Sequence, residues 1–196
     1  MPLMSMYASE FETVDLVLSS KAETRAVDAF ALSLIKCERQ IRRLVTHIVF
    51  QYPCFGFSDI PALRSSLSSN REVYFEGFVR GFDAIYPRSI QDLIGQGCDQ
   101  LRLRLDEAID HRNKIFHGQL TKSWLTRQEL IDYVSDIRSW CSALATAANA
   151  EINYDGFARD SFRKSEVLRI WNRYKLQLTG INDYGDFIQQ HMQRKR

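Results

Sequence analysis

Cysteine and histidine are scarce in this sequence, and neither is spaced as a metal ligand. The four cysteines stand at positions 37, 54, 98 and 141, with no Cys-x2-Cys pair among them. This spacing excludes a zinc knuckle and argues against a disulfide framework. The four histidines form no His-Glu-x2-His motif. We therefore expect reduced thiols, no structural metal and no cofactor.

Long apolar runs and an excess of one charge are missing as well. No segment approaches the ~20 apolar residues of a membrane-spanning helix. The N-terminal stretch carries acids where a secretory signal has basic residues. The 26 basic and 24 acidic side chains give a net charge of only +2, less than a protein that coats duplex nucleic acid usually carries. We expect a cytoplasmic protein with no membrane partner and only local contacts to nucleic acid.

The sequence does contain enough apolar material for one folded domain. Hydrophobic residues make up 45% of the 196 positions, and they recur with the helical period rather than in strand-like alternation. We expect long helices over about 21–51, 70–86, 97–118 and 126–152, short ones near Pro61 and over RSIQDLIGQG, and two more in the last stretch, separated at Gly180. The predicted fold is an all-α antiparallel helical bundle. It forms a single domain over 1–196, with a core at about 21–152 and a C-terminal helical extension at 153–196.

An arginine interrupts the apolar stripe of the helix expected over 97–118. The stripe consists of Leu101, Leu105, Ala108, Ile115 and Phe116, with Ile109 at its edge. Arg112 lies about 20° from Leu101 at 100° per residue, in the middle of this stripe. Burying an unpaired guanidinium costs several kcal/mol, so Arg112 should meet an acid, a carbonyl or a water-filled cleft. The structural alternative is a stem on the core with the head in water.

The other face of the same helix end is polar. Asn113 and His117 are stacked there at i, i+4, and Asp110 and Lys114 lie beside them. An imidazole exchanges protons near neutral pH, and a guanidinium can grip a phosphate with two hydrogen bonds. A histidine at the end of a helix is also a favourable cation on the helix dipole, without any further role.

The string Arg112-Asn113-x3-His117, before a second long capped helix, resembles the HEPN superfamily. The Arg-Asn-x3-His form is associated with its metal-independent ribonucleases. The resemblance implies that Arg112 and His117 are a catalytic pair and that Asn113 shapes the pocket. It further implies a homodimer whose two motifs face a cleft that holds RNA, and cleavage by attack of the ribose 2′-OH on the adjacent phosphate.

The biological setting follows from the resemblance alone. It implies a toxin or an anti-phage abortive-infection effector, restrained by an antitoxin or a partner subunit. In the subgroup paired with a nucleotidyltransferase antitoxin, a tyrosine two residues after the histidine is the modification site. Here that position is Gln119, which argues against this mode of control.

Several residues around the motif are candidates for supporting roles. Glu38 lies at the edge of the apolar stripe of the first long helix, about 60° from Ile41, where its carboxylate can hold Arg112. The alternatives are a surface pair between Glu38 and Arg42, and Asp110 as the acid for Arg112.

Other residues near the motif are candidates for RNA contact. His111 and Lys114 either touch the RNA backbone or are solvated. Trp124 either stacks a base or anchors its loop. The basic tail that begins at Arg194 adds phosphate affinity if it is ordered.

The predicted function is therefore a metal-independent endoribonuclease that acts on single-stranded or looped RNA. The alternative is a non-catalytic HEPN-like module that binds RNA or a protein, with Arg112 as a buried structural ion. A nucleotide-binding bundle is a third reading, but the sequence has no phosphate-loop motif.

Overall fold

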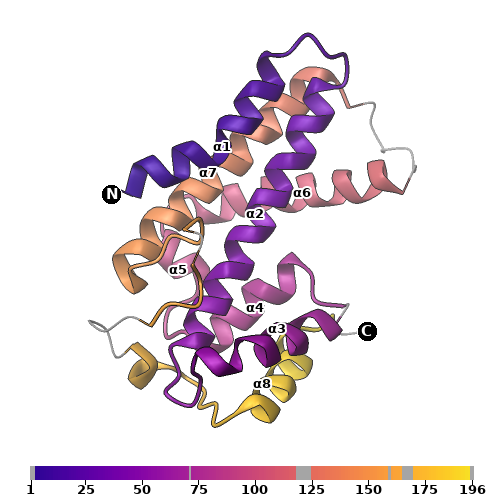
Figure 1. Cartoon of the computed structure of the whole chain (residues 1–196). Helices are drawn as coiled ribbons and strands as arrows, with labels where there is room; N and C mark the ends of the chain where they lie inside the picture. The colour runs from indigo at the N-terminus through magenta and orange to yellow at the C-terminus, as the bar shows by residue number, and fades with distance from the viewer. Residues whose placement is uncertain (1–2, 71, 118–124, 159, 165–169, 195–196) are drawn as a thin grey trace.

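The computed structural model describes residues 3–70, 72–117, 125–158, 160–164 and 170–194. Over these residues it contains helices and no strand (Figure 1), which confirms the predicted all-α class. The elements are α1 (Leu3–Ser19), α2 (Arg25–Phe50), η1 (Phe57–Asp59), α3 (Ile60–Ser69), α4 (Phe75–Ile85), α5 (Ile90–Ile94), α6 (Cys98–Phe116), α7 (Arg127–Ile152), η2 (Ile170–Arg173), α8 (Ile181–Phe187) and the π-helical turn η3 (Ile188–Met192). None of the described helices is long and apolar enough to cross a lipid bilayer.

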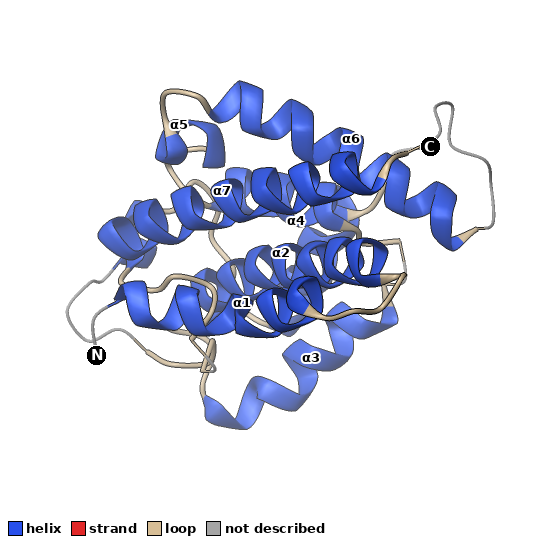
Figure 2. Cartoon of the chain, turned by 90° about the horizontal axis from the view of Figure 1, so that it is seen from above, coloured by secondary structure: helices blue, strands red, loops and turns tan. Residues whose placement is uncertain are grey.

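The centre of the molecule is α2, which packs against α1, α4 and α7 (Figures 1 and 2). Its apolar stripe, including Phe30, Ile41 and Ile48, is fully buried, as the helical period predicts. Helix α1 was not among the predicted helices, and acids are interspersed among its apolar residues. Phe11 and Val14 nevertheless fix α1 in the core, since both are completely buried.

The start and end of α7 agree with the predicted helix over 126–152. Thr126 caps the helix: its Oγ1 accepts a hydrogen bond from the Glu129 N–H at 3.2 Å. In return, Oε2 of Glu129 accepts from the Thr126 N–H at 2.7 Å. These two bonds form the reciprocal capping box that satisfies the first free N–H groups of a helix. Asn153 ends the helix with a left-handed φ of 53°.

The prediction of a helix before Gly180 is wrong for the described residues. Only a 3₁₀ turn, η2, is present, and an irregular segment follows it. The Lys175 N–H donates to the Ile85 carbonyl at 2.9 Å, and the Tyr174 hydroxyl donates to the Ile48 carbonyl at 3.1 Å. The first bond satisfies a backbone N–H that a helix would pair internally, and the second holds the Tyr174 side chain on α2. The break at Gly180 and the helix after it are confirmed as α8 and η3.

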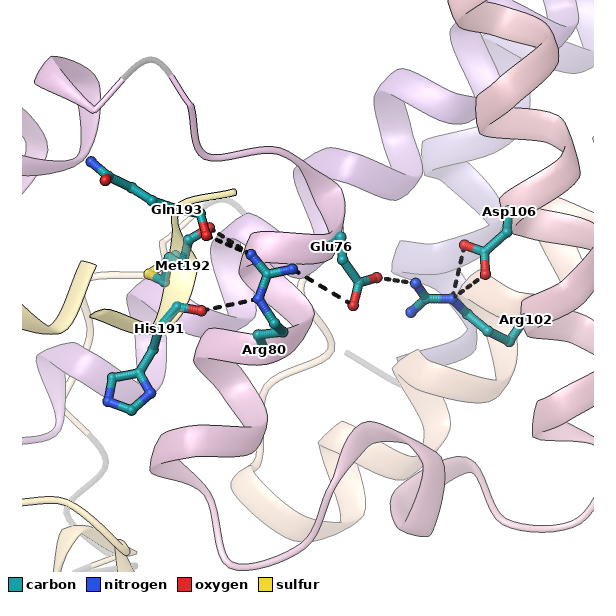
Figure 3. Close-up of polar contacts among 7 residues, drawn as sticks. All are labelled: Glu76, Arg80, Arg102, Asp106, His191, Met192 and Gln193. Carbon is teal, nitrogen blue, oxygen red and sulfur yellow. Dashed lines mark hydrogen bonds and ion pairs between the residues drawn. The ribbon is translucent and has the colours of Figure 1, made fainter. Parts of the chain in front are cut away.

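The C-terminal turn η3 is seated on α4 at two glycines. A Cβ atom on Gly77 would lie 2.1 Å from the Met192 carbonyl oxygen, and one on Gly81 would lie 2.8 Å from the Met192 Cγ. Arg80, between the glycines, donates to the carbonyls of His191, Met192 and Gln193 at 3.3, 3.2 and 2.8 Å (Figure 3). One guanidinium thus satisfies carbonyls that a helix end leaves without partners.

A chain of ion pairs continues from α4 to α6 (Figure 3). Glu76 pairs with two arginines. Its Oε1 lies 3.9 Å from the Arg80 Nη1, and its Oε2 pairs with Arg102. The Arg102 Nε donates to both carboxylate oxygens of Asp106, at 2.9 and 3.0 Å. Because these groups are partly exposed, each pair contributes little to stability. Their geometry does connect the helix that carries the Arg-Asn-x3-His motif to the helix that seats the C-terminal turn.

We predict that Gly77→Ala lowers the free energy of unfolding by about 2 kcal/mol, because the new methyl group overlaps the Met192 backbone. The matched control is Gly185→Ala in α8, where an added Cβ has no heavy atom within 4 Å. That substitution should stabilise by about 0.5–1 kcal/mol, as alanine does in an open helix position. Urea denaturation measures both changes. Equal effects of the two substitutions would show that the seat on α4 is not tight.

Candidate functional site

The C-terminal half of α6 carries the motif and extends beyond the helices that cover its first half (Figure 1). Leu105 and Ala108 are buried against the core. Arg112 follows one turn later, and the helix ends at Phe116. His117 caps the end, and its backbone N–H donates to the Asn113 carbonyl at 3.1 Å. The motif therefore occupies the last turns of a helix whose core contacts lie further back.

Arg112 is held by Glu38, the acid expected from the α2 pattern. The Arg112 Nη2 donates to the Glu38 Oε1 at 2.7 Å, and the two side chains are 19% and 31% exposed. Asp110, the other candidate acid, pairs with Lys114 instead. The Arg112 Nε is buried and has no hydrogen-bond partner in the described part of the chain. The guanidinium is thus fixed at one nitrogen while retaining other donors.

Arg112, Asn113, His117 and Glu38 line one groove of about 660 Å³. Its walls are α2, the residues around the start of α4, and the end of α6. The remaining lining residues are Ile35, Arg39, Arg42, Val73, Tyr74, Phe75, Phe78 and Phe116. A cavity of this size suits a ligand of drug or nucleotide size. The motif residues meet in a concave site that α2 and α4 help to build.

The His117 side chain is exposed at the groove and has no hydrogen-bond partner among the described residues. The Asn113 side chain is also exposed, and within the same residues its amide makes no bond to the imidazole. The one contact between the two residues is through the backbone. The i, i+4 spacing therefore brings the two residues one turn apart without joining their side chains.

His111 and Lys114, the predicted RNA contacts beside the motif, do not line this groove. The His111 ring packs against α7, 5.5 Å from the Tyr133 ring, and its Nδ1 is buried without a partner in the described chain. Burial also raises the pKa of Tyr133 above its ordinary value. Lys114 pairs with Asp110 on the helix surface. Their contact with RNA stays a prediction.

Exposed apolar side chains surround the groove. Ile35, Tyr74 and Phe116 are 51%, 59% and 63% exposed. The helical stripe placed Phe116 in the core, and this expectation is wrong: no neighbouring helix covers the last turn of α6 (Figure 1). Tyr74 precedes α4, and its sequence context gave no sign of this position. Solvent-exposed aromatic side chains beside a groove mark a binding surface.

The groove contains more positive than negative charge. Arg39 pairs with Glu10, and burial, followed by the charge of Arg43, lowers the pKa of Arg39. The Arg42 guanidinium lies 5.2 Å from the centre of the Phe78 ring. It has no carboxylate partner within the described residues, so the surface pair with Glu38 is not formed.

Other predicted contacts lie partly outside the described residues. Trp124 and Gln119 belong to the segment 118–124, and the tail ends at 195–196, so none of these is placed. Arg194 is described, and it lines a recess that also contains Asn113 and Tyr74. The first residue of the basic tail is therefore next to the groove. In the part of the chain that is described, no three His, Cys, Asp or Glu side chains cluster to hold a metal ion.

Comparison with known proteins identifies no relative of this chain. No family model matches the chain, and neither a curated protein nor a solved structure shows a significant match to it.

Proposed function

We propose that this protein is a metal-independent endoribonuclease of the HEPN type that cleaves single-stranded or looped RNA. One observation supports this most: Arg112, Asn113 and His117 line the same groove. The groove thereby offers a guanidinium, an amide and an imidazole to one ligand.

His117 acts on protons in this proposal. As a base, its imidazole takes the proton of the ribose 2′-OH. The 2′-oxygen then bonds to the adjacent phosphorus, and the bond from phosphorus to the 5′-oxygen breaks. The 5′-oxygen receives a proton from the imidazole of a second copy. The products are a 2′,3′-cyclic phosphate and a 5′-hydroxyl, so atoms and charge balance without a metal or an oxidant.

Arg112 stabilises the charge that gathers on the phosphate. Glu38 holds one guanidinium nitrogen at 2.7 Å, which fixes the orientation of the planar group before RNA binds. The remaining N–H donors then meet the phosphate oxygens in the transition state. Donors placed in advance in this way contribute more than donors that must reorient during the reaction.

The second copy belongs to the proposal as well. Ile35, Tyr74 and Phe116 are exposed beside the groove, and apolar side chains grouped around a site are typical of an interface. A homodimer through this rim brings two motifs to one RNA cleft. By the family resemblance, the enzyme is a cytoplasmic toxin or anti-phage effector, restrained by an antitoxin or a partner subunit.

A non-catalytic RNA- or protein-binding module is the second candidate, and the ion pair between Arg112 and Glu38 favours it. A partly buried arginine that is bonded to a glutamate on the central helix is also a common structural element. In that case the groove binds its partner without chemistry.

The experiment that separates the two candidates incubates the protein with end-labelled single-stranded RNA in EDTA. We expect cleavage products that end in a 2′,3′-cyclic phosphate, identified by mass spectrometry. The same sequence with 2′-deoxyribose throughout should remain intact, because the nucleophile is missing. Cleavage of the deoxy strand, or cleavage that requires a divalent ion, would contradict the mechanism. Tight binding without cleavage would favour the non-catalytic module.

A further inference from the structure

A second pocket, of about 630 Å³, lies next to the groove, between α2, α3, α4 and the segment around Ser161. Three arginines line it, namely Arg42, Arg43 and Arg64, and no acidic residue is among its described lining residues. We call it the arginine pocket. Its formal charge of +3 contrasts with the near-neutral balance of the chain as a whole.

The guanidinium groups of this pocket are anchored without a carboxylate. Arg42 lies over Phe78 at 5.2 Å, and Arg64 lies over Phe162 at 5.1 Å. Arg43 donates to the Phe157 carbonyl at 2.9 Å. In the described part of the chain, none of the three forms an ion pair. Each is held by a ring face or a backbone carbonyl, so its charge is not neutralised.

Other arginines of the molecule are neutralised by a carboxylate. Arg102, Arg104 and Arg138 each pair with an aspartate. Three unneutralised guanidiniums in one concave site create a positive potential that attracts an anion. Planar N–H forks match the oxygen atoms of a phosphate in particular.

The arginine pocket is adjacent to the groove, because Arg42, Val73 and Phe78 line both sites. A strand that occupies the groove next to Arg112 therefore has the pocket as its neighbour on the side of Arg42. The buried side chains of Leu63 and Val49 form an apolar floor, next to the amide of Asn70. An apolar floor with a cationic wall is the combination that accommodates a nucleoside phosphate.

We propose that the arginine pocket binds a phosphate of the same RNA strand whose scissile phosphate lies in the groove. This inference rests on the proposed function and adds a subsite to it. A free nucleotide presents the same phosphate chemistry, so the test must separate a strand from a mononucleotide.

The test measures binding by fluorescence anisotropy, with labelled single-stranded RNA of two, four and eight nucleotides and with a labelled mononucleotide. His117→Ala serves as the background, so that the RNA is not consumed. We expect affinity to rise with length. Adding Arg64→Ala should weaken binding of the longest RNA by about 10-fold, the loss of one charge-assisted contact, and leave the dinucleotide unchanged. The slope of log affinity against log salt concentration should become shallower by about 0.7.

The matched control is Lys21→Ala, which removes the same charge from the exposed turn between α1 and α2, away from both sites. It should leave the affinity for every length unchanged. Arg64 is exposed on α3, so its removal should preserve the fold, which circular dichroism checks.

Two results would overturn the inference. In the first, Arg64→Ala and Lys21→Ala behave alike at every length. In the second, Arg64→Ala weakens the mononucleotide and the longest RNA equally, which assigns the pocket to a free nucleotide. Failure of the proposed function gives a different result. In that case the protein with His117 intact does not cleave RNA, and Arg112→Ala leaves binding of the dinucleotide unchanged.

Discussion

Replacing His117 with alanine should lower kcat for RNA cleavage by about 10² to 10⁴-fold, the usual contribution of a general acid or base. KM should change little, because an exposed imidazole without an intramolecular partner contributes more to proton transfer than to binding. Single-turnover cleavage of labelled RNA in EDTA measures the rate. The fold should be intact, since the described structure shows no contact that depends on this side chain.

The control for this substitution is His191→Ala. His191 stacks on Phe187 at 5.4 Å in the C-terminal turn and lies outside the groove. Its loss should leave kcat unchanged. Arg112→Lys adds a second comparison: it keeps the positive charge but loses the planar donor geometry, so we expect a loss of at least about 10-fold. An unchanged rate in His117→Ala would reject the assignment of the active site, whatever the result for Arg112.

Acidification from pH 7 to pH 4 should lower the free energy of unfolding by about 3 kcal/mol through His47 alone. Burial lowers the pKa of this imidazole from 6.5 to about 4. Its Nδ1 lies 3.2 Å from the Ser161 carbonyl and must donate to it, while its Nε2 is buried and has no partner in the described chain. The ring also stacks on Tyr154 at 4.5 Å. Burial and the buried Nε2 without a partner favour the neutral imidazole, and burial outweighs the bond to the Ser161 carbonyl, which raises the pKa.

The sign follows from the two pKa values. Above about pH 6.5 both the folded and unfolded states carry a neutral His47, and this residue contributes no pH dependence. Between pH 6.5 and pH 4 the unfolded chain binds the proton and the folded chain does not. The free energy of unfolding therefore decreases as the pH is lowered through this range. His47→Gln keeps a donor for the Ser161 carbonyl and removes the titration.

Urea denaturation of wild type and His47→Gln at pH 7 and pH 4 gives the measurement. We expect the two proteins to differ in the slope of stability against pH over this range. Exposed carboxylates with lowered pKa values, such as Asp92 and Glu129 at helix starts, lose their contribution at lower pH and are common to both proteins. Parallel curves would show that the His47 imidazole is not held neutral.

The sequence alone was sufficient wherever a local pattern determined the structure. The helical period placed Arg112 among apolar residues and Glu38 at the edge of its own stripe, and the two are bonded. The expected helix over 126–152 matches α7, which Thr126 and Glu129 cap. Each of these patterns spans one or two helical turns, which a single period describes, whereas the contact between Arg112 and Glu38 itself depends on how α2 and α6 pack.

What the sequence did not reveal depends on contacts between distant segments. The irregular course around Tyr174 follows from bonds to α2 and α4, which no local pattern encodes. The exposure of Phe116 depends on where the neighbouring helices end. The arginine pocket brings together Arg42 from α2, Arg64 from α3 and a ring from the segment after α7. Packing decides these positions, and it overrides local propensity.

The seat of Met192 on Gly77 and Gly81 has a consequence for how this protein can vary during evolution. A side chain larger than hydrogen at position 77 collides with the backbone of the last turn, and no change of residue 192 removes that backbone oxygen. At position 81 the collision is with the Met192 side chain, so a smaller residue at 192 relieves it. Natural variants should therefore keep glycine at 77, while positions 81 and 192 are free to exchange volume with each other.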